Sequence, residues 1–110
     1  MKPSVLILIR SDPRTSHRPA EGLRIATGLA VWNQIDVGVY LEGPAGLLLS
    51  EDAQDLKDAE VVEQCRSLIA EKRMNIASSG GIEGSLIETT RMNLKELSEW
   101  TLQFQYSASF

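Results

Sequence analysis

The first apolar run of the chain, Val5–Ile9, contains no polar residue. A strand without polar alternation is covered on both faces, which is typical of central strands in parallel sheets. The charged segment Arg10–Pro19 follows, and apolar residues at helical spacing then extend from Ala20 to Asn33. The pattern therefore predicts a strand, a charged loop and a helix. Ligands of such sheets bind where the carboxyl ends of strands meet helix starts, so we expect function near this loop.

The rest of the chain alternates between short strand patterns and helical patterns. The expected elements are a strand at Ile35–Leu41, a helical turn at Leu47–Leu49, a surface loop at Ser50–Asp55, a helix at Asp58–Arg73, a strand at Asn75–Ala77, a short helix closing at Leu86–Glu88, a strand at Thr89–Met92, a helix at Leu94–Thr101 capped by Asn93, and a final strand or tail at Phe104–Phe110. This order predicts an α/β fold, a three-layer α/β/α sandwich around a mostly parallel sheet of about five strands. We expect one domain over residues 1–110.

Charge and cysteine content narrow the classes of partner. The net charge is -4, which disfavours a nucleic-acid partner because such partners require a basic stripe. No apolar stretch approaches the roughly 18–20 residues that cross a bilayer, so no membrane partner is expected. The sequence predicts no signal peptide, and the single cysteine excludes an internal disulfide. Both features favour the cytoplasm.

Polar side chains that could bind a ligand lie in two loops, which follow the first and third expected strands. They are Arg10, Ser11, Asp12, Arg14 and His17 after the first strand, and Ser78 and Ser79 after the third. Parallel strands bring such loops to one edge, where a small anion could meet arginines and free helix N–H groups. The alternatives are a solvated loop or a rim that pairs with acidic residues of another subunit. A hydrolytic triad around His17 has no supporting motif.

Four stretches and their order resemble the DsrE/DsrF-like family, small α/β proteins that include sulfur-relay subunits related to TusD and TusC. The stretches are VLILIRSDP, EGLRIATGLA with VGVYLEG, EKRMNIASSG, and LIETTRMNLKELSEW with the final ASF. The resemblance covers nearly the whole chain. It implies a parallel sheet of about five strands, assembly into homo-oligomers, and in the sulfur-relay members a persulfide-carrying cysteine just after the strand that corresponds to Asn75–Ala77.

This chain departs from the family at that cysteine, because serines follow Ala77. Serine holds no transferable sulfur, so we expect a non-catalytic, oligomeric accessory or binding protein related by kinship to intracellular sulfur metabolism. The alternatives are a small-anion-binding protein or enzyme that uses the two loops, and a sulfur carrier that uses Cys65. The spacing of Cys65 places it on the apolar face of its helix, which favours burial over reactivity. No cofactor is expected. No metal is expected either, since no His, Asp and Glu set has the spacing of metal ligands.

Overall fold

The computed structural model describes residues 2–50, 55–80 and 87–110. Its elements, in chain order, are β1 (Ser4–Ile9), α1 (Arg18–Trp32), β2 (Asp36–Leu41), the 3-10 helix η1 (Gly43–Leu49), α2 (Ala59–Lys72), β3 (Asn75–Ser78), β4 (Thr90–Arg91), α3 (Leu94–Thr101) and β5 (Tyr106–Ser109). The strands form one sheet in the order β4-β3-β2-β1-β5, and every pairing is parallel. The predicted α/β fold class is therefore confirmed.

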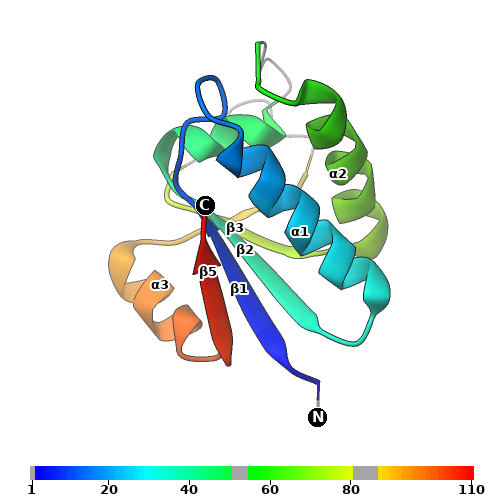
Figure 1. Cartoon of the computed structure of the whole chain (residues 1–110). Helices are drawn as coiled ribbons and strands as arrows, with labels where there is room; N and C mark the ends of the chain where they lie inside the picture. Colours follow the sequence, from blue (N-terminus) through cyan, green and yellow to red (C-terminus); the bar gives the residue numbers. More distant parts are fainter. Residues whose placement is uncertain (1, 51–54, 81–86) are drawn as a thin grey trace.

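Helices cover both faces of the sheet, with α1 and α2 on one side and α3 on the other (Figure 1). Along β1, Ile7 and Ile9 belong to the core beneath α1 and α2, whereas Leu6 and Leu8 belong to the smaller core beneath α3. Successive side chains of a strand point to opposite faces, so a strand buried on both faces requires an uninterrupted apolar run. The interior position predicted for Val5–Ile9 follows from this pattern.

Along β2, apolar residues alternate strictly with other residue types, although the strand lies inside the sheet. Val39 belongs to the core under α1 and α2, while Tyr40 is 1% exposed and packs in the core under α3. Gly38 lies directly beneath the aromatic rings of Trp100 and Phe104. The alternation therefore does not mean that one face of β2 is in water. Both faces are buried, and different residue types pack on each.

Several expected boundaries need correction. The turn expected at Leu47–Leu49 is the end of the longer helix η1, and its last two residues, Leu48 and Leu49, are buried in the core. The strand expected at Thr89–Met92 is reduced to two residues. Most of the loop expected at Ser50–Asp55, and the start of the short helix expected to close at Glu88, fall outside the described residues.

Over the ranges that the structure describes, the helices are too short and too polar for any of them to span a lipid bilayer.

Candidate functional site

The loops that follow β1, β2 and β3 meet at one rim of the sheet, as parallel strands require. The Glu42 N–H donates to the Ile9 carbonyl (2.9 Å), and the Ser79 N–H donates to the Leu41 carbonyl (3.0 Å). The Gly43 N–H in turn donates to the Ser79 hydroxyl (2.9 Å). The structure thus places the loop after β1 and the two serines at the end of β3 on the same rim, with the loop after β2 between them.

The first two residues of the loop after β1, Arg10 and Ser11, are hydrogen-bonded to Phe110. The N–H groups of Arg10 and Ser11 both donate to the Phe110 carbonyl, at 2.7 and 3.3 Å. The Arg18 guanidinium donates to the Ser109 carbonyl (3.0 Å) and lies 5.7 Å from the centre of the Phe110 ring. The two consecutive backbone donors that could cradle an anion here therefore already have an acceptor.

The charged side chains of the β1 loop also have partners within the chain. The Arg10 Nε atom lies 3.4 Å from Glu42 Oε2, and both side chains are about half exposed. The Arg14 guanidinium donates two hydrogen bonds to the Asp12 carboxylate, from Nε to Oδ1 (3.0 Å) and from Nη2 to Oδ2 (2.8 Å). These hydrogen bonds hold the pKa of Asp12 below its ordinary value and raise that of Arg14.

His17 lies immediately before α1, as its N-cap residue. Its Nδ1 atom is 2.7 Å from Asp58 Oδ2, at the start of α2, and the pair joins the two helix starts. A cavity of about 260 Å³ between these helices is lined by both residues, together with Glu21 and Arg24. A serine is not among the residues lining this cavity, so the structure brings imidazole and carboxylate together without the hydroxyl of a triad.

The two serines after Ala77 are both engaged in the turn that they form. The Ser78 side chain is buried and donates to the Gly80 carbonyl (2.6 Å). The Ser79 hydroxyl accepts from the Gly43 N–H. Both hydroxyls therefore stabilise the loops of the rim.

Cys65 lies between α1 and α2 and is 3% exposed. The Thr27 hydroxyl is 3.5 Å from its sulfur atom. Transfer of sulfur requires that a thiolate reach a donor, and the described structure encloses this thiol in the core. The burial expected from the helical spacing is confirmed.

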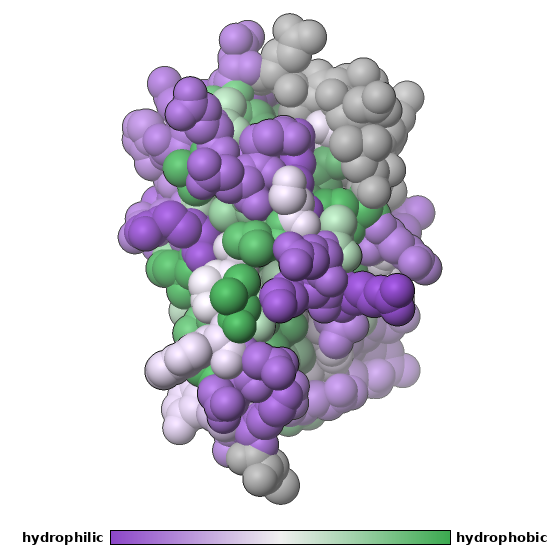
Figure 2. Space-filling view, turned by 90° about the vertical axis from the view of Figure 1, so that its right-hand side faces the viewer, coloured by the Kyte–Doolittle hydropathy of each residue, from purple (hydrophilic) through white to green (hydrophobic). Residues whose placement is uncertain are grey.

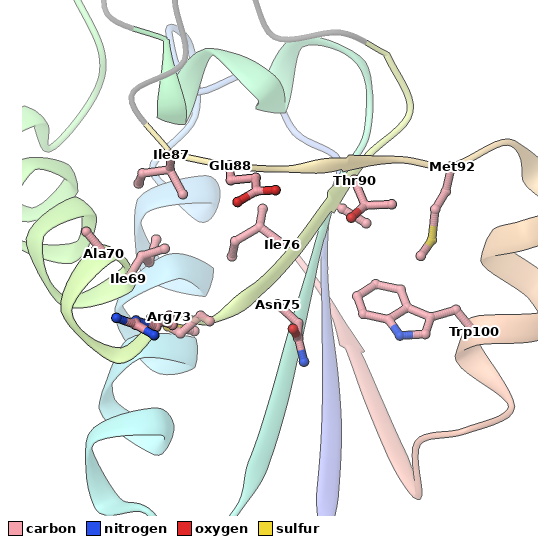
Figure 3. A pocket seen from close by; sticks show the side chains of 12 residues that line it. Ile69, Ala70, Arg73, Asn75, Ile76, Ile87, Glu88, Thr90, Met92 and Trp100 are labelled. Atoms are coloured by element: carbon pink, nitrogen blue, oxygen red, sulfur yellow. The ribbon is translucent and has the colours of Figure 1, made fainter.

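A larger cavity, of about 760 Å³, lies beside β3 and was not expected from the sequence (Figure 3). Its walls come from the end of α2, from β3, from the segment 87–92 and from Trp100 of α3. The sequence signal that could have located it is the extended segment before Asn93, which has polar residues at two positions, Glu88 and Thr90, that line the cavity. Among the described residues, no group of three or more His, Cys, Asp and Glu side chains is placed to hold a metal ion.

The chain matches a known protein in its fold. No protein-family model matches the sequence, and no curated protein matches it. Among solved structures, the crystal structure of the YchN protein from E. coli is similar with a TM-score of 0.75 and 18% sequence identity, over 100% of both chains. At this sequence identity, the similarity shows that the two chains share a fold over their full length. It does not assign a function to this chain.

Proposed function

We propose that this chain is a non-catalytic accessory or binding protein of the DsrE/DsrF type, which acts as an oligomer and does not carry sulfur. The family kinship is supported by the full-length fold match and by the sequence stretches described above. The observation that carries the proposal is the end of β3 and the turn after it, where Ser78 and Ser79 stand in place of the expected thiol and both hydroxyls are engaged. The chain's one thiol, Cys65, is enclosed between helices.

The alternative function, a small-anion binder or enzyme at the rim, has less support. Arg10, Arg14 and His17 each have an acidic partner within the chain. An incoming anion would have to displace a carboxylate at each of these positions. The rim is therefore better suited to holding its own loops than to binding a small anion.

Solvent-exposed apolar side chains support the proposal that the chain forms an oligomer. Leu102 is 86% exposed and Tyr106 is 64% exposed, at the end of α3 and the start of β5. On the side of the molecule where α2 lies, hydrophobic residues reach the surface only in small groups separated by hydrophilic ones (Figure 2). A second copy that covers Leu102 and Tyr106 would remove this apolar surface from water.

A persulfide-transfer experiment tests whether the chain carries sulfur. The protein is incubated with a sulfurtransferase and its sulfur donor, and its intact mass is then measured. We expect no added sulfur in the natural chain, because Cys65 is enclosed and serine forms no persulfide. The variant Ser79→Cys, which places a thiol on the rim, serves as the matched positive control.

One outcome contradicts the proposal. A gain of one sulfur atom in the natural chain that disappears in Cys65→Ala would make Cys65 a carrier. Unchanged mass in the natural chain, together with a sulfur adduct on Ser79→Cys, would support a protein of this fold that has lost the carrier thiol.

A further inference from the structure

The strand β5 is attached to the sheet mainly through its backbone. It lies at one edge, where Tyr106–Ser109 pair with Val5–Leu8 of β1 (Figure 1). All four residues of β5 are exposed, so their side chains bury little apolar surface. Segments with few buried apolar contacts open locally at a low free-energy cost. We therefore expect β5 to separate from β1 while the rest of the fold stays intact.

Side-chain contacts hold the segment 105–110 at its two ends. At the start, the Gln105 N–H donates to the Ser4 hydroxyl (3.0 Å), and the Ser4 N–H donates to Gln105 Oε1 (3.2 Å). At the other end, the Phe110 ring packs directly on Gly22, where a Cβ atom would lie 2.8 Å from Phe110 Cγ. The Arg18 guanidinium lies 5.7 Å from the centre of the same ring. The segment is thus fixed by two end contacts with an exposed strand between them.

These contacts can be made between two copies as well as within one. The partners of the segment 105–110 named above all belong to residues 4–22, which form β1, the loop after it and the first turns of α1. A second copy presents the same groups in the same arrangement. Exchange of an identical element between copies keeps its native contacts and is a low-cost route to a dimer.

The connection between α3 and β5 supplies a reason for the exchange. Leu102 is 86% exposed at the end of α3, and Tyr106 is 64% exposed at the start of β5. In an exchanged pair, both connections pass from one copy to the other and therefore lie side by side. This arrangement brings Leu102 and Tyr106 of the two copies together and removes apolar surface from water, in addition to the contacts that the exchange keeps.

We propose that copies of the chain exchange β5, so that residues 105–110 of each copy complete the sheet of the other. The inference rests on the oligomeric part of the proposed function. It goes further because it specifies the segment that crosses between copies and the surface, the edge of β1, that receives it.

Disulfide formation between two single-cysteine variants tests the exchange. One chain carries Val5→Cys and the other carries Tyr106→Cys, and both carry Cys65→Ala so that each has one thiol. Val5 and Tyr106 face each other in the ladder. Neighbouring strands lie about 4.8 Å apart, which is within the Cα separation that a disulfide spans. The folded chains are mixed, incubated and oxidised without denaturant, and we expect a covalent dimer that contains one chain of each kind.

A variant out of register serves as the matched control. Ser109→Cys places a thiol on the same exposed strand, but Ser109 pairs with Leu8, three residues further along β1 than Val5. A thiol there lies about 10 Å from the position of Val5, beyond the reach of a disulfide. We expect the mixture of Val5→Cys and Ser109→Cys chains to form about tenfold less covalent dimer, because the thiols do not meet.

A chain that carries both Val5→Cys and Tyr106→Cys, again with Cys65→Ala, gives a second test. Oxidation at low protein concentration forms the disulfide within the chain and fixes β5 on its own β1. We expect this oxidised chain to sediment as a monomer at concentrations at which its reduced form is an oligomer. The reduced form is the control, because it has the same sequence.

Three results would overturn the exchange, and they differ in what they mean for the proposed function. If the natural chain is an oligomer and the mixed covalent dimer does not form, the exchange is wrong and the oligomeric part of the proposed function stands. The same holds if the oxidised double variant stays an oligomer, or if Tyr106→Cys chains link only to each other. A monomer at every concentration, without mixed dimer, would contradict both.

Discussion

At the scale of single residues, the exposed pair of Asp12 and Arg14 gives a pH prediction. The side-chain hydrogen bond from Arg14 is the main cause that lowers the pKa of Asp12 from its ordinary value of 3.8. Because the folded pKa lies below the unfolded one, the ionised carboxylate favours the folded chain. This contribution is complete above the ordinary value and is lost as pH falls through the folded pKa.

We therefore expect the Asp12 carboxyl carbon to titrate in NMR with a midpoint below 3.8, the ordinary value. In Arg14→Gln the midpoint should rise toward that value. Arg24→Gln removes another exposed arginine, which lines the cavity between α1 and α2 instead, and it should leave the midpoint unchanged. Identical midpoints in the natural chain and in Arg14→Gln would show that the pair does not form in solution.

The spacing of apolar residues predicted which side chains are buried, but it did not predict which charged side chains pair with each other. The burial of Cys65 follows from its position on one helix face, which is a local property. The pairing of His17 with Asp58 joins residues 41 positions apart, and it depends on how two helices pack. The sequence could therefore indicate which loop carries charge, but not which carboxylate would neutralise each basic side chain.

At the scale of elements, Gly38 of β2 decides how closely α3 packs on the sheet. A Cβ atom at this position would lie 2.5 Å from Phe104 Cζ and 2.9 Å from Trp100 Cζ2. These two rings pack edge to face with their centres 5.2 Å apart, so neither ring can move away alone without losing this contact. Gly38→Ala should lower the free energy of unfolding by about 1–3 kcal/mol, the usual cost of overpacking.

Urea unfolding followed by circular dichroism measures this change. Gly28→Ala is the matched control, because nothing lies within 4 Å of a Cβ atom built there. As an exposed glycine inside α1, it should gain about 0.5–1 kcal/mol from helix propensity. Equal stability of Gly38→Ala and the natural chain would mean that α3 sits farther from β2 than the structure shows.

The bounds of an element were predicted correctly where the sequence contains a local signal such as a helix cap. They were not predicted where such a signal is missing. The helix α3 begins with a capping box, in which Asn93 and Glu96 bond each other's backbone N–H groups, and its expected range is confirmed. The strand β4 has no such signal. Its length is set by where the segment 87–92 crosses the end of β3, and this tertiary feature also creates the cavity.

At the scale of the whole molecule, the layered architecture was predictable because each strand run is followed by a helix or a turn. Parallel strands require crossover connections, and these connections cover the faces of the sheet. The sequence left open how evenly the faces would be covered. α3 alone forms the second helical layer among the described residues, and all four residues of β5 remain exposed beside it.

The exposed strand β5 leads to a prediction about assembly. Its residues, Tyr106–Ser109, carry no charge and form one edge of the sheet. Unprotected strand edges tend to pair with other chains, and Leu102 and Tyr106 add apolar surface at the same side. We propose that copies of the chain associate through this edge, with β5 and the end of α3 in the interface.

Sedimentation velocity over a range of concentrations tests this interface. We expect the natural chain to sediment as an oligomer, and Tyr106→Lys to shift it toward the monomer, because a buried unpaired lysine opposes association. Trp32→Lys replaces an equally exposed aromatic residue at the end of α1, away from β5, and should leave the oligomer intact. Dissociation by Trp32→Lys instead of Tyr106→Lys would place the interface elsewhere. A monomer at every concentration would contradict the oligomeric part of the proposed function, because no other copy would then be present to cover the β5 edge.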